Sequence, residues 1–125
     1  ATKAANEAAA KEAEPQKAEC SFDDFQKMDI RVSTIVAAEK VAKTKKLLKL
    51  TVDTGIDTRE IVSGIAEHFT PEELVGRQVL VLVNLAPREL KGTLSRGMVL
   101  MAEDADGKLV LLSPEKAVKS GSIVG

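Results

Sequence analysis

The sequence predicts an all-β domain of five short strands, with one short helix inserted between the third and the fourth. Three observations carry this prediction. Apolar and polar residues alternate over several short runs, which is the period of a half-buried strand. One interior segment, residues 70–76, carries instead the capping residues of a short helix. The chain has 125 residues, 44% of them hydrophobic and 30% charged, which fits one globular domain.

Residues 1–20 are dominated by Ala, Lys and Glu and lack the large apolar residues that would anchor a helix to a core. This composition predicts a linker or a frayed helix, and it makes residues 21–125 the expected domain. The domain is expected to open with a helical turn that Ser21 caps. Phe22 and Phe25 are three residues apart, so the prediction packs both against the domain from one helical face.

The first three strands follow from the alternation of apolar and polar residues. They are predicted at residues 30–37, 48–53 and 60–65. In the first strand, Val36 is expected on the mostly apolar face. Gly64, near the end of the third strand, predicts a bulge or a close backbone approach.

The short helix is predicted between Thr70 and Gly76. Thr70 suits the N-cap, Pro71 suits the first helical position, and Glu73 completes a capping box. Gly76 suits the end of a helix.

Two further strands and an extension follow the helix. Residues 78–85 form a nearly continuous apolar run, which predicts a strand buried on both faces. Residues 98–103 are expected to pair with 108–113 across a turn at 104–107. A final helical turn is expected to begin at Ser113, before an irregular C-terminus.

This order of elements is typical of the five-stranded oligonucleotide-binding (OB) Greek-key barrel, with short helices and a C-terminal strand and turn as an extension. A generic β-sandwich is the structural alternative. It usually needs about seven strands and has no inserted helix, so the barrel is favoured.

The net charge of −1 conceals two basic segments. Residues 39–49 carry a net charge of +4 and residues 86–97 carry +2, whereas the rest of 21–125 carries −6. In an OB barrel these segments are the loops between strands 1 and 2 and between strands 4 and 5, which bind ligands together with the face of strands 2 and 3. Positive charge at both loops favours a polyanionic ligand over the plain alternative of two solvated lysine-rich loops.

The low aromatic content narrows the range of nucleic acids expected as the ligand. Barrels that bind single strands usually stack bases on aromatic side chains. This chain has three Phe, no Tyr and no Trp, and none of the Phe falls in a predicted strand. We therefore expect recognition of a folded RNA through its phosphates and 2′-hydroxyls rather than stacking of splayed bases.

The sequence offers no pattern typical of an enzyme or a metal site. His68 has no Cys or carboxylate at metal-ligand spacing, and no nucleophile, base and orienting acid form a set. Cys20 has no second cysteine to pair with. No catalytic residue, metal, cofactor or small-molecule substrate is therefore expected in this segment. No apolar run is long enough for a membrane helix, so no membrane partner and a cytoplasmic location are expected.

Five motifs in the same order resemble the tRNA-binding domain at the C-terminus of many bacterial methionyl-tRNA synthetases. They are DFQKMDIRV (24–32), KLLKLTVD (46–53), REIVSGI (59–65), GRQVLVLVNLAPRELKG (76–92) and SRGMVLMAE (95–103). The resemblance covers about residues 22–125. Similar domains also occur as free-standing tRNA-binding proteins and in a small chaperone-like protein, so a free-standing homodimer of the same fold is the alternative.

The resemblance implies a non-catalytic module that binds tRNA by shape, forms a homodimer through its C-terminal extension and raises the tRNA affinity of a methionine-tRNA ligase. ATP, and zinc if a metal is used, would then belong to the catalytic region of the parent. The residues implied to face tRNA are Lys27, Arg31, Lys46, Asn84, Arg88, Lys91, Ser95, Arg96 and Met98. Arg96 departs from the polar or acidic residue common in relatives, and it is expected either to contact phosphate or to pair with Glu89.

Two further expectations concern the surface. Residues 79–83 and 109–112 are more apolar than one small barrel readily covers, which predicts burial of both across a two-fold axis. Whether Lys40, Lys43 and Lys45 contact RNA or only steer it stays open.

Overall fold

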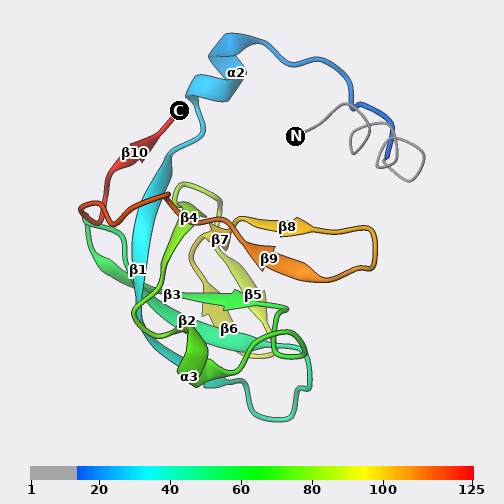
Figure 1. The fold of residues 1–125 in the computed structure, drawn as a ribbon, viewed down its shortest axis with the longest axis vertical. Helices are drawn as coiled ribbons and strands as arrows, with labels where there is room; N and C mark the ends of the chain where they lie inside the picture. Colours follow the sequence, from blue (N-terminus) through cyan, green and yellow to red (C-terminus); the bar gives the residue numbers. More distant parts are fainter. Residues whose placement is uncertain (1–13) are drawn as a thin grey trace.

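The computed structural model describes residues 14–125 and is mostly β (Figure 1). Within this range the helices are short, α2 (Phe22–Gln26) and α3 (Pro71–Leu74). The strands are β1 (Ile30–Lys40), β2 (Leu48–Asp53), β3 (Thr58–Ser63), β4 (Gln78–Leu82), β5 (Arg88–Leu90), β6 (Thr93–Ser95), β7 (Met98–Val99), β8 (Met101–Glu103), β9 (Leu109–Leu111) and β10 (Ile123–Val124). Most of the predicted linker lies outside the described residues, and its last part, 14–20, is exposed and irregular.

Five antiparallel strands form a nearly closed barrel, which confirms the predicted fold. The strands lie in the order β3-β2-β1-β4-β7. The segment that joins β6 to β7 returns to β3, where the Arg96 amide donates to the Glu60 carbonyl oxygen at 2.9 Å. The Val62 amide donates to Ser95 Oγ, also at 2.9 Å. These two bonds close the barrel between its first and last strands in space.

The barrel interior is filled by the alternate residues of its strands. Leu48, Leu50 and Val52 of β2 are fully buried, as are Val79 and Val81 of β4. The last two belong to the core of this chain, so Val79 and Val81 cannot contribute to the dimer surface predicted at 79–83, whereas Leu80 and Leu82 remain partly exposed. The prediction that β4 is buried on both faces is only half right, because its other face is only partly covered by the C-terminal extension.

Strand β1 is longer than predicted, and its apolar face is different. A β-bulge between Ile35 and Ala37 shifts its register against β2 and reverses the inward and outward alternation. Ser33 and Ile35, which precede the bulge, are buried, whereas Val36 is exposed and Ala38, beyond the bulge, packs against the core. The irregularity expected at Gly64 is found here instead, and β3 ends before Gly64.

Helix α3 confirms the predicted capping box. Thr70 and Glu73 exchange side-chain to backbone hydrogen bonds, and Pro71 occupies the first turn. Leu74 of this helix is fully buried in the barrel core.

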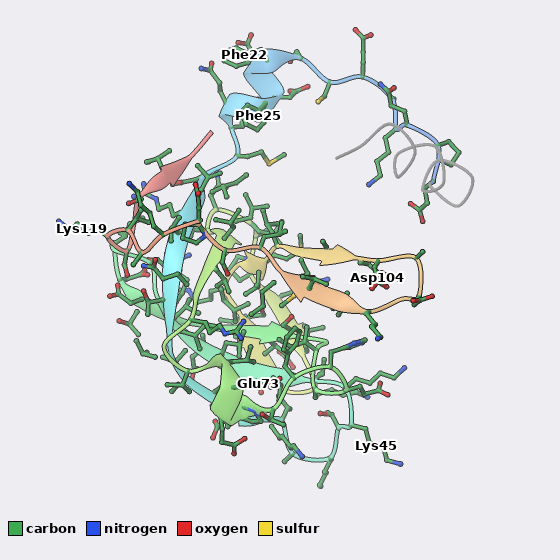
Figure 2. All side chains as sticks on the ribbon, in the orientation of Figure 1. Phe22, Phe25, Lys45, Glu73, Asp104 and Lys119 are labelled. Atoms are coloured by element: carbon green, nitrogen blue, oxygen red, sulfur yellow. The ribbon has the colours of Figure 1, made fainter. Side chains whose placement is uncertain are left out.

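Helix α2 forms as predicted, but it does not pack against the domain as predicted. Ser21 caps it by accepting a hydrogen bond from the Asp24 amide at 3.1 Å. Phe22 and Phe25 contact each other with ring centroids 6.4 Å apart, yet they remain 69% and 43% exposed. The helix stands above the barrel instead of lying on it (Figure 2).

The region after β4 is more structured than predicted. Residues 86–97 were expected to be a loop, but most of them form the β5–β6 hairpin. The predicted strand 98–103 is split, because β7 pairs with β4 in the barrel whereas β8 leaves it to pair with β9.

The C-terminal extension packs along the barrel as a strand and turns. No helical turn begins at Ser113; the Gln78 side-chain amide instead exchanges two hydrogen bonds with the Val118 backbone, at 2.6 and 3.0 Å. The Thr34 and Ser120 hydroxyls are 2.8 Å apart. The end is not irregular, since β10 pairs with the start of β1. No helix among residues 14–125 is long and apolar enough to span a membrane.

Candidate nucleic-acid interface

The two basic segments meet at one end of the barrel. The loop between β1 and β2 and the β5–β6 hairpin line one cavity of about 520 Å³. We call it the basic cavity, and its lining residues are Lys43, Thr44, Lys45, Lys46, Leu47, Glu89, Leu90 and Lys91. Lys45 marks the tip of the first loop, at the end of the molecule opposite α2 (Figure 2). Four cations and one carboxylate thus converge from segments more than 40 residues apart in sequence.

Two of these lysines have left-handed backbones. Lys43 has a φ of 64° and Lys91 a φ of 49°, a region that costs a non-glycine residue roughly 1 kcal/mol or more. Lys91 and Gly92 form the two-residue turn of the β5–β6 hairpin, where Asn or Gly is usual at the first position. The turn geometry itself does not favour lysine at this position.

The outer face of β2 and β3 is neutralised internally. Lys49 Nζ lies 2.7 Å from Glu39 and 3.3 Å from Glu60, and the hydrogen bond with Glu39 is the main reason that the pKa of Lys49 is raised. This cluster has one more acid than base. The strand face is therefore a poor anion surface, and the uncompensated positive charge lies on the loops.

Arg59 holds together the two ends of the segment between β4 and β7. Its Nη1 donates to the carbonyl oxygens of Val83, at 2.8 Å, and Arg96, at 3.4 Å. Asp57 orients the guanidinium through two bonds of 2.9 Å. Because Val83 and Arg96 bracket the β5–β6 hairpin, Arg59 is a positioning residue for the hairpin's side of the basic cavity.

Asp57 gives this network a pH dependence. The hydrogen bond from Arg59 is the main reason that the pKa of Asp57 is lowered, so its stabilisation is complete above the unfolded pKa of about 3.9 and is lost as pH falls further. At pH 7, Asp57→Asn is expected to lower the free energy of unfolding by about 1 kcal/mol, reduced for partial exposure. Urea titrations of both proteins check this. A difference that persists unchanged at pH 2.5 would contradict it.

Three predicted residues lie together at the start of β1, away from the basic cavity. Asn84 Oδ1 accepts from the Asp29 amide at 2.9 Å, and Asn84 Nδ2 donates to the Lys27 carbonyl oxygen at 2.6 Å. Arg31 donates to both carboxylate oxygens of Asp29, at 2.9 and 3.2 Å. Asn84 thus joins the end of α2 to the end of β4. The guanidinium of Arg31 already forms an ion pair with Asp29, so part of its hydrogen-bonding capacity is used within the chain.

The remaining predicted residues follow the hairpin toward β7. Ser95 is only 2% exposed and its hydroxyl bonds Val62 and Gly97, so a direct RNA contact by Ser95 does not fit this structure. Arg96 lies 3.9 Å from Asp57 and is half exposed, which is not the expected pairing with Glu89. Arg88 is exposed on β5, and Met98 is 42% exposed.

Residues 30–123 match the family model described as "Putative tRNA binding domain". The chain belongs to this family. Among curated relatives, it is 64% identical to a methionine-tRNA ligase of Cytophaga hutchinsonii, over 99% of this chain and 18% of that protein. It is 62% identical to the enzyme of Flavobacterium psychrophilum, over 94% of this chain and 17% of that protein. The chain thus spans under a fifth of the length of these relatives.

Solved structures of similar proteins share the fold. A protein of Pyrococcus horikoshii related to methionyl-tRNA synthetase superposes with a TM-score of 0.82 at 40% identity, covering 87% of this chain and all of that one. The chaperone CsaA of Bacillus anthracis superposes with a TM-score of 0.79 at 28% identity, covering 86% of this chain and all of that one.

In this tRNA-binding domain, the sequence predicted where positive charge gathers but not which residues hold the basic cavity in place. Lys43 and Lys45, left open above, line the basic cavity beside Lys46 and Lys91. The role of Arg59 was missed, because its contacts with the ends of the hairpin segment are to the backbone carbonyls of Val83 and Arg96, which no sequence pattern reveals.

Proposed function

We propose that this domain binds folded tRNA through the basic cavity and the adjoining Arg88 and Arg96. The convergence of Lys43, Lys45, Lys46 and Lys91 at one end of the barrel is the observation that carries the proposal. Glu89 is the one acid among the lining residues, so the local charge is +3, in a chain whose net charge is −1. Such a concentration of cations attracts a phosphate backbone.

Lys27, Arg31 and Asn84 extend this interface toward the start of β1. The side chain of Lys27 is exposed and only 3.6 Å from Asp24, a surface pair that phosphate can readily replace. A footprint that runs from the basic cavity to this group follows the length of the barrel, which suits recognition of RNA by shape.

We further propose that the parent protein is a methionine-tRNA ligase and that this domain raises its tRNA affinity. The identity of 64% to such a ligase over nearly the whole chain supports this. Aminoacylation, with its ATP and any zinc, would take place in the catalytic region of the parent. The alternative is a free-standing, chaperone-like binding protein, which the likeness to CsaA favours. The reading frame upstream of Ala1 distinguishes them, since a catalytic region there decides for the ligase.

The salt dependence of tRNA binding tests the RNA proposal. Fluorescence anisotropy with labelled tRNA should give a plot of log affinity against log salt with a slope of about −3 or steeper, as expected when several phosphates are neutralised. Binding that is insensitive to salt, or no binding to bulk tRNA at low salt, would contradict the proposal.

Lys91→Asn separates the charge of the hairpin from its shape. Asn is favoured at the first position of this turn, so the thermal stability of the variant should equal or exceed that of the original chain. Its tRNA affinity should fall about threefold at low salt and the salt slope should become shallower by about 0.7 to 0.9. Lys116→Asn, an exposed lysine of the C-terminal extension, is the control. Equal slopes for the two variants would argue against a phosphate contact at Lys91.

We also propose a homodimer, formed through an apolar surface at the end opposite the basic cavity. Phe22, Phe25 and Met28 of the N-terminal segment expose large apolar areas there, and Ile123 of β10 is 70% exposed. Exposed clusters of this kind are typical of protein interfaces. A two-fold contact at this end would leave both basic cavities open, and it would bring Lys27 and Arg31, the neighbours of Met28 and Ile123, of the two copies near each other at its edge.

Ile123→Lys tests which surface dimerises. Sedimentation velocity at tens of micromolar should show a dimer for the original chain and a monomer for this variant, because a lysine cannot be buried unpaired. Val110→Lys is the matched control, since Val110 is half exposed on β9 within the surface first suggested by the sequence. If only the Val110 variant were monomeric, the dimer interface would instead include β9.

A further inference from the structure

The basic cavity is not built like a simple phosphate site. Its walls are mostly apolar, with Leu47 and Leu90 partly buried within it and lysine side chains around them. A phosphate group needs donors and charge, and it gains nothing from an apolar wall. Lysine can supply both kinds of surface, because its methylenes cover apolar groups while its ammonium stays in water. The cavity therefore fits a ligand with an apolar body and an anionic edge.

We propose that the basic cavity receives one unstacked nucleotide of the bound RNA. The base lies against Leu47 and Leu90, and the flanking phosphates lie near the ammonium groups of Lys43, Lys46 and Lys91. The volume of about 520 Å³ is within the range of roughly 300 to 1,000 Å³ found for small-ligand pockets. This inference rests on the proposed function, since it assigns one nucleotide of the same RNA to a defined place.

Glu89 indicates which bases the cavity accepts. A carboxylate in a cavity that receives phosphate opposes binding unless the ligand offers it a donor, and an ionised carboxylate only accepts hydrogen bonds. Among residues 14–125 Glu89 has no ion-pair partner. Exocyclic amino groups, such as N4 of cytosine, are the donors that acidic side chains recognise on bases. The cavity therefore favours a base with an amino group over uracil.

The scarcity of aromatic residues does not exclude this mode of binding. Phe22 and Phe25 lie at the opposite end of the molecule, so stacking on an aromatic ring is absent from the cavity. Aliphatic side chains still remove the face of a base from water, with a smaller gain than a stacked ring gives. One base held weakly in this way is consistent with an interface dominated by phosphates.

Nucleotide titrations followed by NMR of the 15N-labelled 125-residue chain test the inference. CMP at millimolar concentration should shift the amide signals of Leu47, Leu90 and Lys91. Ribose 5-phosphate, which has the same sugar and phosphate without the base, should bind at least about fivefold more weakly. UMP should bind more weakly than CMP. Equal binding of CMP and ribose 5-phosphate would overturn the proposal and leave only an anion site.

Two matched variants test the same idea with intact tRNA. Leu90→Ala should lower tRNA affinity about fivefold without changing the salt slope, because an apolar contact is lost and no phosphate contact is. Leu94→Ala is the control, since Leu94 lies on the same hairpin, is exposed, and is outside the cavity lining. Equal losses for the two variants would overturn the proposal.

Glu89→Gln provides a readout that does not depend on folding of the Leu90 variant, because Glu89 is exposed. It removes a negative charge, so ribose 5-phosphate should bind more tightly, whereas the preference for CMP over UMP should disappear. A preference that survives in this variant would contradict the role of Glu89.

If the original chain binds tRNA with a steep salt slope but CMP and ribose 5-phosphate bind equally, the nucleotide inference fails alone. If it does not bind tRNA, the proposed function fails as well.

Discussion

Removing three cations from the basic cavity should abolish most of the affinity for tRNA. In a variant with Lys43→Asn, Lys46→Gln and Lys91→Asn, we expect affinity to fall on the order of 50-fold at low salt, and the salt slope to become shallower by about 2. Asn tolerates the left-handed backbones at positions 43 and 91, so the fold should be retained. Anisotropy titrations over a range of salt concentrations measure both quantities.

The control for this variant has the same net charge. Three exposed lysines outside the cavity, Lys108, Lys116 and Lys119, can be replaced together by Gln. Both variants then change the formal net charge of the chain by the same three units. If affinity depended only on total charge, the two variants would lose it equally. A much larger loss in the cavity variant is the result that a local phosphate site requires.

The order of the barrel strands could be predicted because its signals are local. The alternation in β2 and the capping box at Thr70 each reside within a few neighbouring residues. The β5–β6 hairpin was missed because its turn is Lys91–Gly92, without the Asn that usually marks such turns. The bulge in β1 was missed because it depends on pairing with β2, which alternation in one strand cannot reveal.

The candidate site shows the same division. The sequence located the positive charge correctly, because charge is a property of each residue and the fold assigns the loops to one end. The sequence could not show that Lys49 forms ion pairs with Glu39 and Glu60, since Glu60 lies on another strand. The sequence also could not show that Ser95 is buried. The motif that contains Ser95 is equally compatible with a ligand-binding loop and with a segment that pairs with β3 to close the barrel.

Gly55→Ala should cause the largest loss of stability of any single change considered for this chain. Gly55 has a φ of 84°, and a Cβ there would lie 2.4 Å from the Ser120 carbonyl oxygen and 2.5 Å from the Gly121 Cα. Both atoms belong to the backbone, so no side chain can rotate away. We expect the free energy of unfolding to fall by about 3 to 5 kcal/mol, as measured in urea.

Gly64→Ala is the matched control, because no atom lies within 4 Å of a Cβ at Gly64 and its φ is not positive. That variant should stay within about 1 kcal/mol of the original chain. The contact at Gly55 also holds the C-terminal extension against the barrel. Gly55→Ala should therefore increase amide exchange in β10 before it does so in β2. Since Ile123 of β10 belongs to the proposed dimer surface, the variant should dissociate at concentrations where its barrel is still folded. Loss of the barrel and the dimer in one step would show instead that the extension and the barrel form one cooperative unit.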